Sequence, residues 1–193
     1  MRSILVLSLK LLVITLVAGL ALGATYAITE EPIRQQNILK AEAARKSIFG
    51  EADFEQATEV EAIRATDERF AGVTDAYYAV QSGQITGCVV SIAASGYGGD
   101  ITLTVGVDPE GRIAGLEVGS HSETPGLGAK ARDAAFKEQF AGRRAPLAVV
   151  KSDQPSENEI SAITGATITS QGVTDATNLA AEFAARLFAA GGK

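Results

Sequence analysis

The sequence predicts an α+β fold, with an N-terminal transmembrane helix followed by an antiparallel sheet and flanking helices. Three observations predict it: a long uncharged apolar segment near the N-terminus, short alternating segments separated by glycine turns in the middle, and helical periodicity towards the C-terminus. Because the strands are grouped first and the helices follow, the pattern favours an α+β arrangement over a doubly wound parallel sheet.

Composition limits the chemistry that the chain can perform. The 193 residues include 17 Lys and Arg against 23 Asp and Glu, and the acidic balance without a basic run argues against nucleic acid as a partner. A single cysteine, Cys88, excludes an internal disulfide and a cysteine-ligated cluster, and a single histidine, His121, excludes a multi-histidine metal site. We therefore expect no metal site, and any chemistry must need few titratable groups or a borrowed cofactor.

Residues 1–30 are predicted to form a membrane anchor. Leu11 to Thr29 is a run of 19 residues without a charge, which at about 1.5 Å per residue nearly covers a hydrocarbon core of roughly 30 Å. Arg2 and Lys10 precede this run and acidic residues follow it. The positive-inside rule therefore predicts a single-pass protein of the inner (cytoplasmic) membrane, with its N-terminus in the cytoplasm and the remainder on the periplasmic, extracytoplasmic side.

A cleaved signal peptide is the alternative for this segment. The apolar stretch is long for such a peptide, and Gly23 and Ala24 make a poor cleavage site. Either interpretation exports the rest of the chain.

Residues 31–72 are predicted to be a helical stalk and linker. Pro32 suits the first turn of a second helix over roughly 31–49, which Phe49 and Gly50 end. This helix would hold the following domain away from the membrane.

Residues 73–193 are predicted to form the functional domain. Asp108 to Gly111 reads as a turn between two strands, which makes the strand region an antiparallel meander. The predicted strands are 76–80, 88–92, 101–107, 113–118 and the shorter 147–150. Helices are predicted over 129–141 and 171–189, with a surface loop over 151–159.

Two loops contain residues suited to binding a ligand. His121 to Gly128 has two glycines around Leu127, which let the backbone approach a flat ligand, although composition alone favours a plain strand-to-helix connection with a glycine turn. Thr164 to Ser170 places hydroxyls and a glycine before the last helix, a favourable position for a phosphate. The alternative for this second loop is that Thr169 or Ser170 simply caps the helix.

Three motifs carry a resemblance to a known family: Gly96-Tyr97-Gly98-Gly99-Asp100-Ile101, Glu123-Thr124-Pro125-Gly126-Leu127-Gly128 and Thr164-Gly165-Ala166-Thr167. In this order and spacing they resemble the FMN-binding domain of respiratory flavoproteins. The chain resembles the G subunit of the Rnf electron-transport complexes, and it is similar to, but shorter than, the C subunit of the Na⁺-pumping NADH:quinone oxidoreductase.

The resemblance implies a covalently bound FMN. In the family a flavin transferase attaches FMN through its phosphate to the last residue of a motif Asp-x-x-[Ser/Thr]-Gly-Ala-[Thr/Ser], which makes Thr167 the acceptor here and Thr169 the second choice. Ser161 stands at the position of the motif's Asp. The cofactor-binding residues that the resemblance implies are Thr164, Gly165, Ala166, Thr167, Glu123, Thr124, Pro125, Gly126, Leu127 and Gly128. Whether His121 or Tyr97 also contacts the flavin is left open.

The function that the resemblance implies is that of a membrane-anchored electron carrier, one subunit of an ion-translocating ferredoxin:NAD⁺ oxidoreductase (a translocase) without a complete active site of its own. It would relay single electrons through FMN, with the other membrane and redox subunits of the Rnf complex and the flavin transferase as partners. The alternatives are the C subunit of the quinone-reducing pump and a non-redox, membrane-anchored binding module.

Overall fold

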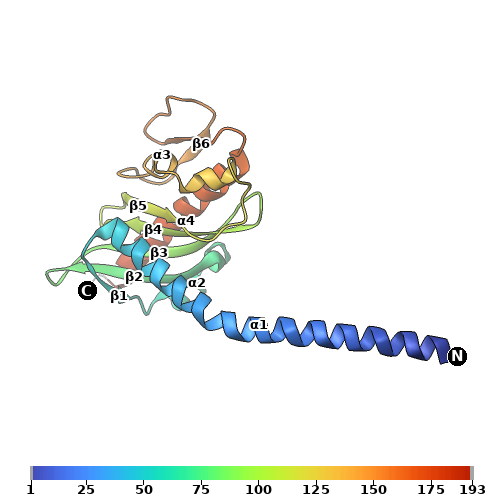
Figure 1. Cartoon of the computed structure of the whole chain (residues 1–193). Coiled ribbons are helices and arrows are strands. Elements are labelled where there is room, and N and C mark those ends of the chain that lie inside the picture. Colours follow the sequence, from blue (N-terminus) through green and yellow to red (C-terminus); the bar gives the residue numbers. More distant parts are fainter. Residues whose placement is uncertain (1, 192–193) are drawn as a thin grey trace. The chain divides into compact units, whose positions relative to one another are not determined.

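The computed structural model describes residues 2–191, which divide into two compact units that meet between Lys40 and Ala41. Helix α1, Arg2–Phe49, begins in the first unit and ends in the second (Figure 1). The sequence predicted two helices here, separated near Pro32. Instead α1 continues through Pro32, which removes one backbone hydrogen bond without ending the helix.

The first unit contains α1 up to Lys40, including its apolar part. Its described side chains are exposed, and the helix is long and apolar enough to cross a membrane by length and composition. A signal sequence near the N-terminus would satisfy the same criterion.

The second unit is built on a five-stranded sheet in which every neighbouring pair is antiparallel. Its strands, in spatial and chain order, are β1 (Asp53–Gln56), β2 (Val73–Gln81), β3 (Gln84–Ser95), β4 (Asp100–Val107) and β5 (Ile113–Val118). The predicted antiparallel meander is confirmed, and the α+β fold class with it. β1 was not predicted, because it is a four-residue edge strand with little apolar alternation.

The remaining elements differ from the sequence prediction in detail. They are α2 (Val60–Arg64), η1 (Glu68–Gly72), η2 (Gly128–Arg132), α3 (Ala134–Lys137), β6 (Ala148–Val150), β7 (Glu159–Ser161) and α4 (Thr167–Gly191). The helix predicted over 129–141 is divided by Asp133, whose backbone is extended. The predicted surface loop 151–159 ends at β7, which pairs in parallel with β6.

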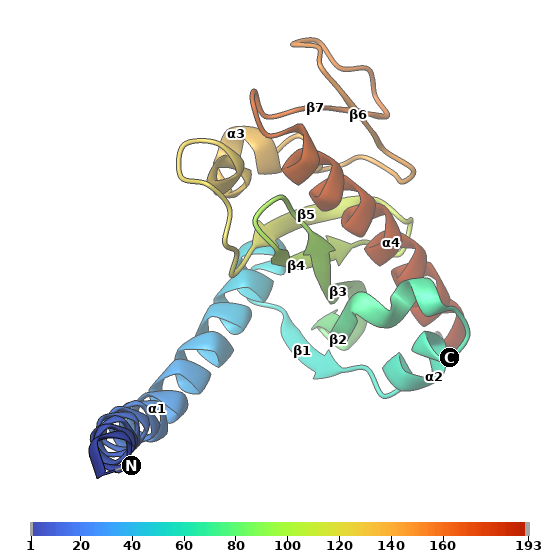
Figure 2. The ribbon, with the colours of Figure 1, turned by 90° about the vertical axis from the view of Figure 1, so that its right-hand side faces the viewer.

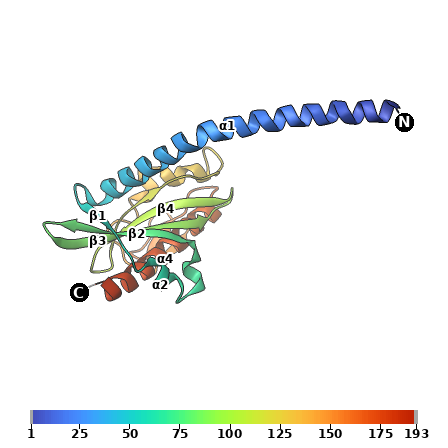
Figure 3. The same cartoon turned by 90° about the horizontal axis from the view of Figure 1, so that it is seen from below.

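Helix α4 covers one face of the sheet (Figures 2 and 3). Alternate strand residues such as Val90, Val105 and Leu116 belong to the core on this side. Phe183 of α4 meets Phe70 edge to face, with ring centroids 5.2 Å apart. The core of the second unit therefore lies between the sheet and α4, and it fixes the position of this helix.

The last turn of α1 packs on three neighbouring strands through a groove of glycines. A Cβ at Gly106 would lie 2.3 Å from Ile48 Cγ2, and one at Gly87 would lie 2.3 Å from the ring of Phe49. Nearby, the Arg45 guanidinium lies 4.1 Å from the centroid of the Tyr77 ring. Residues 41–72, which the sequence assigned to a stalk and linker, are thus part of the second compact unit.

Candidate functional site

Three segments that are distant in the sequence meet at the N-terminal end of α4 and enclose a pocket of about 550 Å³. Tyr97 comes from the turn between β3 and β4, a second group follows β5, and a third begins α4. The lining residues are Tyr97, Glu123, Thr124, Leu127, Gly128, Gly165, Ala166, Thr167, Ile168 and Thr169.

Thr167 is the first residue of α4 and its side chain is exposed at the pocket. Gly165 turns the chain into the helix with a φ of 78°, a conformation that favours glycine. The next residue, Ala166, is buried and packs the loop against the domain. The hydroxyl of Thr167 therefore lies where the partial positive charge of a long helix favours a phosphate.

Thr169 and Ser170 point inwards. Thr169 is 1% exposed and its hydroxyl donates a hydrogen bond of 2.5 Å to Glu123 Oε2. The Ser170 hydroxyl donates to the Ala166 carbonyl and accepts from the N–H of Ile163. The alternative that either residue is the N-cap of α4 is therefore wrong, because the helix begins at Thr167 and both residues lie inside it.

Glu123 lies in the interior of the site, with 6% of its surface exposed. Its Oε1 accepts a hydrogen bond of 2.8 Å from the N–H of Gly98. Burial by itself raises the pKa of this carboxyl, but hydrogen bonds from the Thr169 hydroxyl and from the N–H groups of Gly98 and Tyr97 lower the pKa overall. Glu123 is therefore an ionised carboxylate that connects all three segments of the pocket.

Three large apolar side chains are exposed where they line the pocket: Tyr97 (73% exposed), Leu127 (43%) and Ile168 (58%). Ile168 was not among the predicted site residues. Ile168 could have been recognised as a pocket residue from the pattern Thr167-Ile168-Thr169. Neighbouring residues on a helix face different directions, and Thr169 faces inwards.

The structure brings most of the predicted residues together but leaves some outside the lining. Predicted residues that line the pocket are Thr167, Gly165, Ala166, Glu123, Thr124, Leu127 and Gly128. Thr164, Pro125 and Gly126 belong to the same two loops but do not line the pocket.

Two residues that the sequence singled out have structural contacts. His121 does not line the pocket, and its Nδ1 accepts a hydrogen bond from the N–H of Glu123. Ser161 ends β7, where its N–H donates to Gln139 Oε1 and its hydroxyl donates to the Ser152 carbonyl. Ser161 thus connects the segment after α3, which contains Gln139, to the loop after β6, which contains Ser152.

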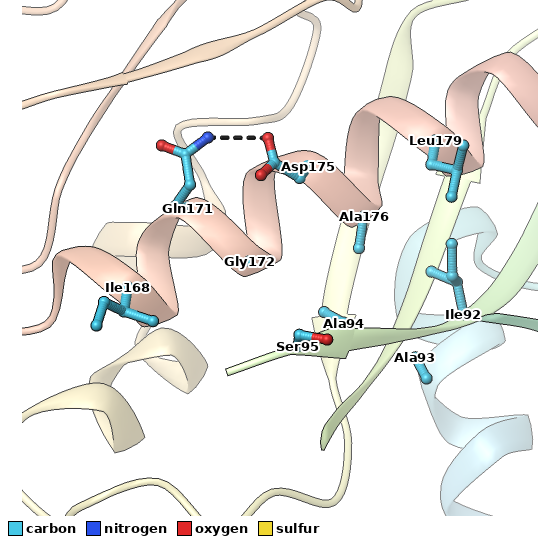
Figure 4. A pocket seen from close by; sticks show the side chains of 10 residues that line it. All are labelled: Ile92, Ala93, Ala94, Ser95, Ile168, Gln171, Gly172, Asp175, Ala176 and Leu179. Carbon is cyan, nitrogen blue, oxygen red and sulfur yellow. Dashed lines mark hydrogen bonds between the residues drawn. The ribbon is translucent and has the colours of Figure 1, made fainter. Parts of the chain in front are cut away.

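A second cavity of about 420 Å³ lies between the end of β3 and α4 (Figure 4). It shares Ile168 with the first pocket, and Gln171 donates a hydrogen bond to Asp175 at its edge. A Cβ at Gly172 would lie 2.0 Å from the Ser95 carbonyl oxygen. Only glycine allows α4 to approach β3 this closely, which fixes the start of the helix beside the pocket.

The residues present fit the FMN that the resemblance implies. The volume lies within the usual range for small-molecule sites of roughly 300–1,000 Å³. Leu127 and Ile168 offer apolar surface for a flat ring, and Thr167 offers an exposed hydroxyl beside a helix N-terminus. Among residues 2–191, no group of three or more His, Cys, Asp or Glu side chains is arranged to hold a metal ion.

Comparison with known proteins places the chain in a family. Residues 96–182 match the family model described as "FMN-binding domain". The chain is 37% identical to the G subunit of the Na⁺-translocating ferredoxin:NAD⁺ oxidoreductase complex of Acetobacterium woodii, covering 90% of this chain and 87% of that protein. It is 31% identical to the G subunit of the proton-translocating ferredoxin:NAD⁺ oxidoreductase complex of Clostridium ljungdahlii, covering 94% and 91%.

Two solved structures resemble part of the chain. The C subunit of the Na⁺-translocating NADH-quinone reductase of Parabacteroides distasonis has 26% sequence identity and a TM-score of 0.50, covering 58% of this chain and 62% of that one. NqrC of Shewanella oneidensis, at 23% identity and a TM-score of 0.51, covers 60% and 61% and supports the fold alone. With the relatives that match over almost its whole length, these findings show that the chain belongs to the G-subunit family of ion-translocating oxidoreductase (Rnf) complexes and contains an FMN-binding domain.

Proposed function

We propose that this protein is the membrane-anchored flavoprotein subunit of an ion-translocating ferredoxin:NAD⁺ oxidoreductase, and that it relays single electrons through FMN bound to Thr167 by a phosphoester. The observation that supports this most directly is the position of Thr167, an exposed hydroxyl at the first residue of α4 and on the pocket. The G-subunit relatives named above support the wider complex.

Attachment at Thr167 is chemically reasonable for this geometry. The Thr167 oxygen would form the new bond to phosphorus while the bond to the leaving group of an activated FMN donor breaks, and the hydroxyl proton departs with that group. A flavin transferase would supply the donor. The phosphodiester would keep a negative charge, which the N-terminal end of α4 stabilises.

Thr169 is the weaker candidate for the acceptor. It faces the interior of the domain, where its hydroxyl donates to Glu123. A transferase would have to break this hydrogen bond and open the start of α4 to reach it.

The chain itself binds and orients the cofactor, which supplies one- and two-electron chemistry when bound. Leu127 and Ile168 would exclude water from part of the ring, and the backbone around Thr124 and Gly128 would offer polar contacts. We propose that electrons arrive from and leave to other subunits of the complex. We also propose that the N-terminus of α1 lies in the cytoplasm and the FMN domain on the periplasmic, extracytoplasmic side.

The test is to co-express the full chain with a flavin transferase, purify it under denaturing conditions, and measure intact mass and flavin fluorescence. Wild type should gain the mass of one FMN less one water. Thr167→Val should lose both signals, whereas Thr167→Ser, which keeps a hydroxyl at the same position, should retain them.

The other outcomes separate the remaining alternatives. Covalent flavin in Thr167→Val would exclude Thr167 as the only acceptor, and Thr167→Val combined with Thr169→Val would then be measured. Absence of covalent flavin from wild type beside an active transferase would overturn the proposal and favour a non-redox binding module. The C subunit of a quinone-reducing pump would be indicated if the purified complex reduced quinone with NADH.

A further inference from the structure

Glu123 is a buried carboxylate whose hydrogen-bond donors are a backbone N–H and a hydroxyl. No Lys or Arg forms a salt bridge with it within residues 2–191. Its charge is balanced instead by hydrogen bonds from neutral donors, the N–H of Gly98 at 2.8 Å and the Thr169 hydroxyl at 2.5 Å. A negative charge in such surroundings keeps much of its electrostatic effect, because little solvent screens it.

The backbone on both sides of Glu123 is shaped around its carboxylate. A Cβ added at Gly96 would lie 2.3 Å from Oε1, and one added at Gly128 would lie 2.1 Å from Oε2. Any other residue at these two positions would displace the carboxylate. The two glycines therefore allow the loop after β3 and the loop after β5 to close on the same charged group.

The hydrogen bonds of Glu123 join segments that lie far apart in the sequence. Gly98 belongs to the β3–β4 turn, Glu123 follows β5, and Thr169 lies in the first turn of α4, 46 residues further along the chain. Thr169 is two residues from Thr167. Holding Thr169 in place consequently fixes the first turn of α4, on which Thr167 lies.

We propose that Glu123 is a positioning residue that fastens the three walls of the pocket together, and that its fixed negative charge lowers the reduction potential of the FMN bound there. The effect on the reduction potential rests on the proposed function, because it requires bound FMN. The fastening role rests on the protein without its cofactor. The charge acts through space: electrons added to the cofactor are disfavoured by a neighbouring anion. Glu123 itself transfers neither protons nor electrons in this proposal.

The test uses the full chain in detergent, co-expressed with the transferase, and compares Glu123→Gln with wild type. Gln has nearly the same volume; its oxygen still accepts from Gly98, and its amide can donate to the Thr169 oxygen after that hydroxyl rotates. Asp175→Asn is the matched control, because it removes an exposed charge from the same helix as Thr167, outside the FMN pocket.

The first readout is the reduction potential of the bound FMN, measured by spectroelectrochemical titration. Glu123→Gln should raise the potential by at least about 59 mV, which corresponds to a tenfold change in the equilibrium constant of a one-electron reduction. Asp175→Asn should change the potential much less. Equal shifts in the two variants would overturn the electrostatic half of the proposal, since they would reflect net charge alone.

The second readout is the melting temperature of flavin-free protein prepared without transferase. Thr169→Val should melt below wild type because it removes one of the fastening hydrogen bonds, and Thr169→Ser should restore the wild-type value. Equal melting temperatures of Thr169→Val and wild type would overturn the fastening role.

The two halves of the proposal can fail separately. If wild type binds no FMN, the proposed function fails, while the melting temperatures still decide the fastening role. If Glu123→Gln does not fold, the wild-type potential is followed against pH. Reduction of FMN itself takes up protons, so free FMN over the same pH range is the control. The potential of the bound FMN must rise more steeply than that of free FMN as Glu123 takes up its proton below its lowered pKa, and equal slopes would contradict the proposal.

Discussion

At the scale of single residues, His121 makes a pH-dependent contribution to the stability of the fold. Its Nδ1 must be unprotonated to accept the N–H of Glu123. Burial and the positive charge of Arg132 lower the pKa of His121, with Glu123 opposing them. A lowered pKa means that the fold prefers the neutral ring. The stability that His121 contributes is therefore present above its unfolded pKa of about 6.5 and is lost as the pH falls through its folded pKa.

We expect the melting temperature of the full chain to fall as the pH is lowered from about 7 to 5, as one hydrogen bond worth about 1 kcal/mol is lost. His121→Asn should reduce this fall, because an Asn side chain can accept from the backbone N–H two residues on at any pH in this range. Equal pH dependence in His121→Asn and wild type would show that another group is responsible.

The residues of the site were predictable to different degrees. Thr167 and the loop containing Leu127 carry local motifs, so the sequence predicted them as candidates, and both line the pocket. The hydrogen-bonding role of Glu123 was not predictable, because its partners at Gly98 and Thr169 are 25 and 46 residues away and only the folded sheet brings them together. The exposure of Ile168 depends on where α4 begins, which the sequence placed about four residues too late.

At the scale of elements, the groove of glycines under α1 should be sensitive to a single methyl group. In Gly106→Ala the new Cβ would lie 2.3 Å from Ile48 Cγ2 and 2.9 Å from the Phe49 ring. Overpacking of this kind costs about 1–3 kcal/mol. We expect Gly106→Ala to lower the free energy of unfolding by that amount, measured by chemical denaturation of the full chain in detergent.

A neighbouring glycine supplies the control. In Gly115→Ala, on the adjacent strand, the Cβ would meet Ile48 Cγ2 at 3.6 Å, an ordinary contact. Its free energy of unfolding should be close to that of wild type. Combining Gly106→Ala with Ile48→Ala should cost less than the sum of the single changes, because the clashing methyl group is gone. Strict additivity would show that α1 does not pack here.

Strands with a strong alternation of apolar and polar residues could be predicted from the sequence. Strands that exist because a neighbouring strand pairs with them could not. β4 alternates apolar and polar or small residues along its length, and its prediction over 101–107 differs from Asp100–Val107 by one residue. β1 has the sequence Asp53-Phe54-Glu55-Gln56, and it is a strand only because β2 offers it an open edge. The pairing of β6 with β7 likewise depends on chain segments that lie apart in the sequence.

At the scale of the whole molecule, the uncharged segment from Leu11 to Thr29 determines how the protein associates with a membrane. An uncleaved anchor would keep this segment in the mature chain, whereas a signal peptide would be removed near Gly23 and Ala24. Intact mass distinguishes the two directly. We expect full-length chain in the membrane fraction, resistant to extraction at alkaline pH.

Charge placed inside the segment tests the anchor energetically. Lysine near the centre of a membrane helix costs about 2.5–3.5 kcal/mol in insertion, so Leu16→Lys combined with Leu20→Lys should move most of the protein out of the membrane fraction. Leu16→Ala combined with Leu20→Ala, which adds no charge, should leave most of it there. If the mature wild-type chain lacks the residues up to about Gly23 and Ala24, the signal-peptide alternative is correct. The second compact unit, which begins at Ala41, would then reach its partner subunits without a membrane helix of its own.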